Sequence, residues 1–393
     1  MNQISRPSLP KCENMIKVRG EIRLPEGSAF YPQWKTSGSN PVYGGYQDAC
    51  ETLVCDTKTF DVITHKSGKS FPLGQHIKPI KMLDQELYLQ GSSFINAPRL
   101  YRLDRKTGEL TFAKNDTSRN DNAFTCRQIW AHSEDGTRIP IDCFGTLAGK
   151  QPTIVFIYGG FGRNNHSFYS PDIYSKWLTR GYSVAVIHSR GGGEYGKAWH
   201  QAGVKAGRRK VREDIASSIR ELHRQDICTP ETTFVHGLSH GALLAAITTI
   251  HHPELVSQVI CRVPISSTKD LPKTTLGRQW LDEYGDPQTS DWDNFMKEED
   301  PLACDATPQS LSNTSWLIIG YCHDAVTAIS HADALVERVN NLGGEVTYWR
   351  YSSKGGHEGA CDPSKRIAHE RKLWSYLSQK ASEIKMKATG SPC

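Results

Sequence analysis

The sequence predicts an α/β fold with a doubly wound, mostly parallel sheet and a small β-rich region before it. Two observations carry this prediction. From about residue 125, short apolar runs alternate with segments of helical periodicity, which is typical of strands and helices that follow one another along the chain. Residues 1–124 instead hold polar-flanked β runs with Asp, Lys, Thr and Gly turns and no helical periodicity.

The main region opens with a predicted β-hairpin. The stretch "FTCRQIWAHSEDGTRIPIDCFGTL" holds two strand-like runs around Asp135 and Gly136. Further strands are expected at 153–158, 182–188, 232–237, 256–263, 315–321 and 345–351. Their apolar character indicates burial on both faces, as in a parallel sheet covered by helices. Helices are expected near 170–180, 211–225, 240–250, 329–342 and 363–385. We therefore predict one α/β domain over 125–385 and a C-terminal tail over 386–393.

The N-terminal region, residues 1–124, contains two β units that are loosely similar to each other. "ETLVCDTKTFDVITHKSG" and "RLYRLDRKTGELTFAKND" each carry a D-x-K-T turn. Repeated short β units of this kind are typical of propeller blades. A closed propeller needs at least four blades of about 40 residues each, so we expect a partial propeller here.

Composition favours a globular protein without a membrane segment. The chain has 393 residues, a net charge of +5 and eleven cysteines with no C-x-x-C pair. Unpaired cysteines in this number are typical of a reducing compartment. The N-terminus lacks the apolar segment of a secretory signal, and no apolar stretch approaches the roughly 18 residues of a membrane span. We expect a cytoplasmic location and make no prediction of oligomeric state.

Two motifs raise the question of nucleic-acid or nucleotide binding, and both are better explained otherwise. The basic run Lys205–Arg212 is short, so we expect the solvated start of a helix and no nucleic-acid partner. Residues Gly191–Ala198 approach a phosphate-binding loop, but Ala198 lacks the hydroxyl that would ligate Mg²⁺. There is no H-E-x-x-H metal signature. No cofactor and no metal are expected.

A candidate nucleophile lies in "FVHGLSHGALL", residues 234–244. Ser239 stands between Gly237 and Gly241 in G-x-S-x-G spacing, with a strand before it and a helix after it. A serine on such a sharp strand-to-helix turn presents its hydroxyl above the sheet edge. The motif alone is common, and the strand and helix around it give it weight.

A serine nucleophile needs a base, and the base needs an orienting acid. In this fold the order after the serine is acid and then histidine. Asp324 follows the strand "SWLIIGY", and His357 lies in a Gly-flanked loop after the last strand. Singly, Asp324 is better explained as the cap of the helix that follows and His357 as a surface-loop histidine. Together, in the right order and each beyond a strand end, they predict a Ser239–His357–Asp324 triad.

Hydrolysis also needs donors for the developing oxyanion. The backbone N–H of His240, directly after the serine, is one candidate. The loop "YGGFG" at 158–162 follows a strand, and its glycines allow close approach to a substrate. Tyr158 at the start of this loop can supply a hydroxyl donor.

The chain resembles the prolyl oligopeptidase family of serine peptidases in "YGGFG", "RGGGEYGKAWH", "GLSHGA", "RQWLDEYGDP", "CHDAV" and "GGHEG". The resemblance covers roughly 125–380 and implies an α/β-hydrolase fold. It places Ser239, Asp324 and His357 on the family triad and Tyr158 on its oxyanion tyrosine. It further implies that Phe161, Trp280 and Tyr284 line a pocket for a proline side chain. The implied function is cleavage of peptides, after proline in particular, through an acyl-enzyme on Ser239.

The chain also departs from the family pattern. His240 replaces the usual Asn, Ala242 replaces a Gly, and Val326 replaces an Arg that anchors a substrate carbonyl. Most of the propeller that covers the family's active site is absent from this sequence. Two alternatives therefore stay open: an esterase or acyl transferase that uses the same triad, and a non-catalytic truncated relative that binds a partner.

Overall fold

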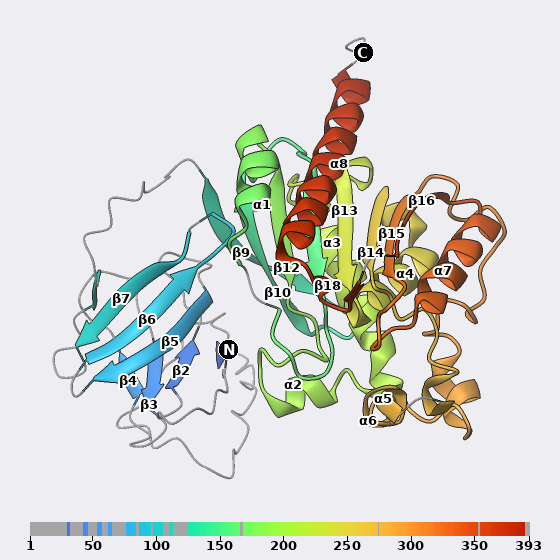
Figure 1. The fold of residues 1–393 in the computed structure, drawn as a ribbon, viewed down its shortest axis with the longest axis horizontal. Helices are drawn as coiled ribbons and strands as arrows, with labels where there is room; N and C mark the ends of the chain where they lie inside the picture. Colours follow the sequence, from blue (N-terminus) through green and yellow to red (C-terminus); the bar gives the residue numbers. More distant parts are fainter. Residues whose placement is uncertain are drawn as a thin grey trace, which may run out of the picture.

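The computed structural model describes residues 124–165, 168–273, 275–352 and 354–389, together with parts of the N-terminal region. Those parts are residues 30–31, 42–45, 53–56, 62–64, 76–83, 86–95, 97–104 and 110–112. Figure 1 shows a central sheet with helices on both faces and a separate group of strands on the N-terminal side.

The central sheet has eight strands in the order β16-β15-β14-β13-β11-β12-β10-β9. The strands from β11 to β16 pair in parallel, while β9 and β10 form the antiparallel hairpin and β10 pairs antiparallel with β12. The predicted mostly parallel α/β fold is confirmed. The strands are β9 (Thr125–His132), β10 (Arg138–Gly145), β11 (Thr153–Ile157), β12 (Ser183–Ile187), β13 (Thr233–Leu238), β14 (Gln258–Arg262), β15 (Ser315–Tyr321) and β16 (Glu345–Tyr351).

The helices form two layers that enclose the sheet. The helices α3 (Arg208–Arg224), α4 (His240–His251) and α7 (Ile329–Asn341) contribute to one core, and α1 (Pro171–Lys176) and α8 (Pro363–Thr389) contribute to the other. Alternate residues of β11 enter opposite layers, since Val155 packs in the first core and Ile154 in the second. The helix α8 continues to Thr389, so the first residues of the predicted tail are helical.

Shorter elements complete the domain. These are the helices α2 (Lys197–Gln201), α5 (Thr275–Arg278) and α6 (Leu281–Tyr284), and a small pair of strands, β17 (Gly355–Gly356) and β18 (Gly359–Ala360). Strand β11 lies between β12 and β13. The chain passes from β11 to β12 on one side, and after β12 it returns to place β13 on the other side of β11, so the strand order reverses at β11. In open α/β sheets, ligands bind beyond the carboxyl ends of the strands at such a reversal.

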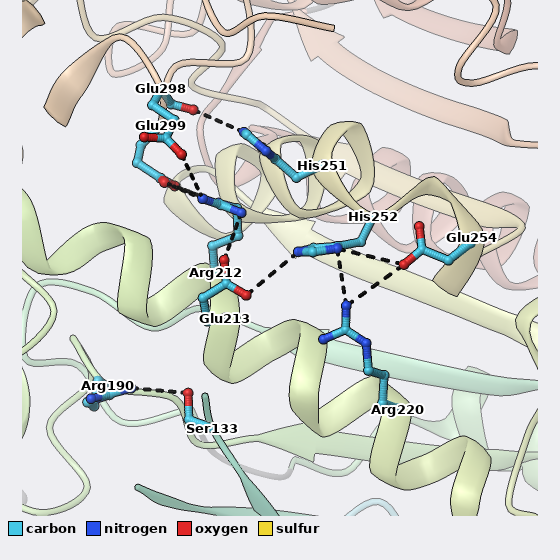
Figure 2. Close-up of polar contacts among 10 residues, drawn as sticks. All are labelled: Ser133, Arg190, Arg212, Glu213, Arg220, His251, His252, Glu254, Glu298 and Glu299. Atoms are coloured by element: carbon cyan, nitrogen blue, oxygen red, sulfur yellow. Dashed lines mark hydrogen bonds and ion pairs between the residues drawn. The ribbon is translucent and has the colours of Figure 1, made fainter. Parts of the chain in front are cut away.

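The basic run Lys205–Arg212 was predicted to be a solvated start of a helix, and this is wrong for two arginines at the start of α3. The side chain of Arg212 is 4% exposed and contacts Glu299 and Glu213 (Figure 2). Arg208 is also buried, with its guanidinium 4.4 Å from the ring centre of Tyr284. Because both cations have partners inside the protein, they are not part of a free basic surface.

The N-terminal strands form two four-stranded antiparallel sheets, each with its strands in sequence order. Sequential antiparallel strands in groups of four are typical of propeller blades. The first sheet holds β1 (Phe30–Tyr31), β2 (Val42–Gly45), β3 (Leu53–Asp56) and β4 (Val62–Thr64); the second holds β5 (His76–Leu83), β6 (Glu86–Ser92), β7 (Arg99–Asp104) and β8 (Leu110–Phe112). The boundary at residue 124 stays a prediction.

One side chain of the N-terminal region enters the core of the α/β domain. Phe94 lies between β6 and β7 and is fully buried. Its ring stacks on Phe156 of β11 at 5.2 Å and meets Phe144 of β10 edge-on at 5.4 Å. The two regions therefore share part of one hydrophobic core.

The described helices include none that is both long and apolar enough to cross a bilayer.

Candidate active site

Ser239 lies on a strained turn between β13 and α4. Its φ of 58° and ψ of −114° fall outside the regions that most residues occupy, and such conformations cost about 1–3 kcal/mol. The turn is fixed by its neighbours, since Ser239 N donates to the Arg262 carbonyl at 2.8 Å. A strained backbone at the carboxyl end of a strand is the geometry that the G-x-S-x-G spacing predicts.

The two flanking glycines are required by close backbone contacts. A Cβ atom at Gly237 would lie 2.0 Å from the Gly241 carbonyl oxygen, and one at Gly241 would lie 2.5 Å from the Ile157 carbonyl oxygen. Any larger residue would push α4 away from β11 and β13. The spacing of the motif thus has a steric cause.

Asp324 and His357 are in contact. His357 Nδ1 lies 3.0 Å from Asp324 Oδ2, and the backbone N–H groups of Val326 and Thr327 donate to Oδ1 at 2.8 and 3.0 Å. Burial alone would raise the pKa of Asp324, but the hydrogen bonds from His357 and the two amides outweigh it and lower that pKa. An ionised carboxylate only accepts hydrogen bonds, so His357 Nδ1 carries the proton and Nε2 remains an acceptor.

Thr327 links this pair to the serine turn. Its hydroxyl lies 2.9 Å from Asp324 Oδ2, 3.3 Å from His357 Nδ1 and 3.1 Å from the carbonyl oxygen of Val263. Val263 follows Arg262, whose carbonyl accepts the Ser239 N–H. Within the described residues, no hydrogen bond joins the Ser239 hydroxyl to His357. The acid–base pair is therefore assembled, while the serine–base contact is open; such contacts often tighten only with substrate.

The loop after β11 is tightly turned. Positive φ angles occur at Gly159, Phe161 and Gly162, and Gly162 N donates to the Gly191 carbonyl at 3.0 Å. Tyr158 at the start of this loop is partly buried, and burial raises the pKa of its hydroxyl. The hydroxyl therefore stays protonated and able to donate at neutral pH.

The glycine-rich loop after β12 packs directly on this turn. A Cβ atom at Gly191 would lie 2.4 Å from the Gly159 carbonyl oxygen, and one at Gly193 would lie 2.2 Å from that of Gly162. Arg190, at the start of the loop, donates to both carboxylate oxygens of Asp214 and to Ser133, the last contact being drawn in Figure 2. These glycines serve backbone packing, which is a different use from a phosphate cradle.

His240 contributes a side chain that the sequence analysis left out. As the first residue of α4, its backbone N–H has no partner inside the helix. Its buried ring bridges two groups: Nε2 lies 3.2 Å from the Gly159 carbonyl oxygen, and Nδ1 lies 2.7 Å from the Tyr284 hydroxyl. Burial, helped by the charge of Arg208, lowers the pKa of His240 to about 3. The neutral ring donates from Nε2 and accepts at Nδ1.

The three aromatic residues expected in the substrate pocket lie together. The Phe161 ring centre is 6.1 Å from that of Trp280 and 5.8 Å from that of Tyr284, both edge-on. Phe161 and Trp280 are partly exposed, whereas Tyr284 is fully buried. Tyr284 thus packs behind the other two and is not itself at the surface.

Sequence reasoning missed Glu283 and His200. Glu283 Oε1 accepts the Phe161 N–H at 2.7 Å, and Glu283 Oε2 lies 2.7 Å from His200 Nε2. The partners of Glu283 are 122 and 83 positions away along the chain, so no spacing pattern could have indicated them. Groups of three or more His, Cys, Asp or Glu residues able to hold a metal do not occur in the described part of the chain.

The chain is similar to known peptidases over its α/β domain and beyond. It is 27% identical over 309 residues to an uncharacterized peptidase, y4nA, of Sinorhizobium fredii, which covers 76% of this chain and 42% of that protein. It is 28% identical to prolyl oligopeptidase A of Amanita bisporigera over 66% of this chain and 35% of that protein. The chain therefore spans less than half the length of these relatives.

Solved structures agree with this similarity. A structure described in a study of two prolyl endopeptidases superimposes with a TM-score of 0.77 at 26% identity, covering 91% of this chain and 53% of the other. A post-proline cleaving enzyme from Rickettsia typhi, at 23% identity and a TM-score of 0.75, shares the fold over 89% of this chain and 51% of its own. The model of the prolyl oligopeptidase family matches residues 169–383. This match spans more than half of the chain, which belongs to the prolyl oligopeptidase family.

Proposed function

We propose that this protein is a serine peptidase that cleaves peptides through an acyl-enzyme on Ser239. The observation that carries the proposal is the Asp324–His357 pair, which Thr327 links to the strained Ser239 turn. The family and the names of the relatives, among them a prolyl endopeptidase of Elizabethkingia meningoseptica at 28% identity, support a peptide substrate.

In the proposed reaction the Ser239 oxygen attacks the scissile carbonyl carbon while its proton passes to His357 Nε2. Asp324 holds the imidazole in this tautomer and stabilises the imidazolium that forms. The carbonyl oxygen becomes an oxyanion, which the Tyr158 hydroxyl and the His240 N–H stabilise. The C–N bond then breaks, and the amine leaves with the proton from His357. His357 then takes a proton from a water molecule, whose oxygen attacks the acyl carbon. The bond to Ser239 breaks, the serine oxygen receives the proton from His357, and the acid product leaves.

The aromatic pair Phe161 and Trp280 supports selectivity for an apolar ring at the acyl side of the scissile bond. Two partly exposed rings whose planes meet at 71° accept a flat apolar side chain without a charged partner. Proline meets this description, and cleavage after proline is therefore our first expectation.

One observation favours a second candidate, an esterase or acyl transferase. Val326 lies two residues after Asp324 and is 37% exposed. It presents an apolar side chain at the position where the family pattern has an arginine that holds a peptide carbonyl. Weaker peptide positioning affects amides more than activated esters, because the ester carbonyl needs less help to react. An ester could then be the better substrate.

The test combines active-site labelling with two substrate classes. Wild type and Ser239→Ala are treated with a fluorophosphonate probe and assayed with a proline anilide peptide, its alanine analogue and an aryl ester. Stoichiometric labelling and proline anilide cleavage, both lost in Ser239→Ala, are expected. Rapid ester cleavage without anilide cleavage would favour the second candidate. A folded, monodisperse wild type that reacts with no probe would contradict both and favour a non-catalytic binding role. The cytoplasmic location and the absence of nucleic-acid partners stay predictions.

A further inference from the structure

The short helix α6 holds the Tyr158–Gly162 loop at two points. The first contact is direct: Glu283 Oε1 accepts the backbone N–H of Phe161 at 2.7 Å. The second passes through a histidine: the Tyr284 hydroxyl donates to His240 Nδ1, and His240 Nε2 donates to the Gly159 carbonyl. Consecutive residues of one helix thus fix two points of one loop.

The loop needs such support because its backbone is strained. Phe161 is not a glycine, yet its φ is 57°, a conformation that is uncommon for residues with a side chain. Conformations of this kind persist only where the surroundings impose them. The 2.7 Å hydrogen bond from the Phe161 N–H to the Glu283 side chain constrains the backbone at this position.

Glu283 is placed for support and not for substrate. The residue is 5% exposed, and each of its two oxygens already has a partner, since Oε2 lies 2.7 Å from His200 Nε2. The His200 ring also packs against Gly162: a Cβ atom placed on this glycine would lie 3.4 Å from His200 Cγ. A carboxylate that recognised a basic substrate would need at least one accessible oxygen.

We propose that Glu283 is a positioning residue: by fixing the Phe161 backbone it holds the Tyr158 hydroxyl in place, with the Tyr284–His240 bridge as the second arm of the same clamp. The inference rests on the proposed function, because it assigns Tyr158 to the oxyanion. Loss of the Glu283 arm loosens the loop, so that the donor is misplaced for the transition state.

The test is a double-mutant cycle between Glu283→Met and Tyr158→Phe, with the proline anilide as substrate. Removal of one oxyanion donor lowers kcat by about 10²–10³-fold. Glu283→Met is expected to lower kcat by about 10–100-fold with KM within a few-fold. If Glu283 acts through Tyr158, the double variant is at most about threefold slower than Tyr158→Phe alone. Losses that multiply in the double variant would overturn the proposal.

Two further variants separate positioning from general damage. Glu283→Gln keeps an oxygen acceptor for Phe161 N–H and is expected to recover most of the lost kcat. Asp282→Met makes the same replacement at an exposed neighbouring carboxylate and is expected to leave kcat unchanged. If Glu283→Gln were as slow as Glu283→Met, hydrogen bonding to Phe161 would not be the cause.

Amide hydrogen exchange tests the clamp without any activity. The peptide that contains residues 158–163 is expected to exchange faster in Glu283→Met than in wild type and Asp282→Met, with exchange in α3 unchanged. Unchanged exchange at 158–163 would overturn the clamp, whether or not the enzyme is active. A wild type that fails to label with the fluorophosphonate while exchange changes as expected would reject the proposed function and leave the clamp standing.

Discussion

The two halves of the candidate site differ in how they are held. The serine half, at the ends of β11 and β13, is fixed mainly by backbone contacts, at the Ser239 turn and in the packing of Gly191 on Gly159, and the side chains of Glu283 and His240 add support to the Tyr158–Gly162 loop. The histidine half, at the ends of β15 and β16, is fixed by side chains, with Asp324 and Thr327 around His357. Thr327 and the 262–263 backbone connect the two halves.

This difference suits the two halves to different steps, charge stabilisation in the serine half and proton transfer in the histidine half. Donors for a developing charge act best when they need no rearrangement, and backbone packing provides this rigidity. A base must approach the serine and then the leaving group, which a side chain on a loop can do. The open Ser239–His357 contact is consistent with a histidine half that closes on a preformed serine half.

The strongest way to break the comparison is Asp324→Asn. The amide would present an N–H to His357 Nδ1 and favour the wrong tautomer, so we expect kcat to fall by about 10⁴-fold. The serine half should be untouched, so the melting temperature should change by only a few degrees. Steady-state kinetics and thermal unfolding check both. A loss below tenfold would show that the pair does not orient the base.

Thr327→Val removes the hydroxyl that connects the halves while keeping the shape of the side chain. Hydrogen bonds to charged groups contribute about 1.5–3 kcal/mol, so a kcat loss of about 10–150-fold is expected, with KM little changed. Thr179→Val, at an exposed threonine in the 3-10 turn that follows α1, is the matched control and should have no effect on kcat. Equal kinetics in the two variants would mean that the halves are not coupled through Thr327.

The smallest effect concerns stability. His236 on β13 is 5% exposed, and burial lowers its pKa to about 3. Between that value and the unfolded pKa near 6.5, His236 is protonated in the unfolded chain but neutral in the folded chain. The free energy of unfolding therefore falls as the pH decreases. From pH 7 to 5.5, wild type should lose about 1 kcal/mol more than His236→Leu. Denaturant unfolding at both pH values measures this, and parallel losses would contradict a neutral His236.

The sequence predicted the sheet well because its strands are apolar on both faces, a pattern that few other structures share. It also placed Ser239, Asp324 and His357 beyond strand ends, since local spacing and chain order determine those positions. Glu283 and the ring of His240 could not be predicted in the same way. Their roles depend on the return of residues 281–284 to the β11 loop, and no local pattern encodes that contact. The buried arginines Arg208 and Arg212 were misjudged because acidic partners from distant segments surround Arg212.

The Phe94 ring has a practical consequence for anyone who wishes to prepare the α/β domain alone. Trimming the chain at residue 124 would remove an aromatic ring from the space between Phe144 and Phe156. Emptying a space of that size typically destabilises a protein by about 3–5 kcal/mol, a large share of the margin by which most domains stay folded. A shortened chain that begins before Ser93 would keep the Phe94 ring packed against Phe144 and Phe156.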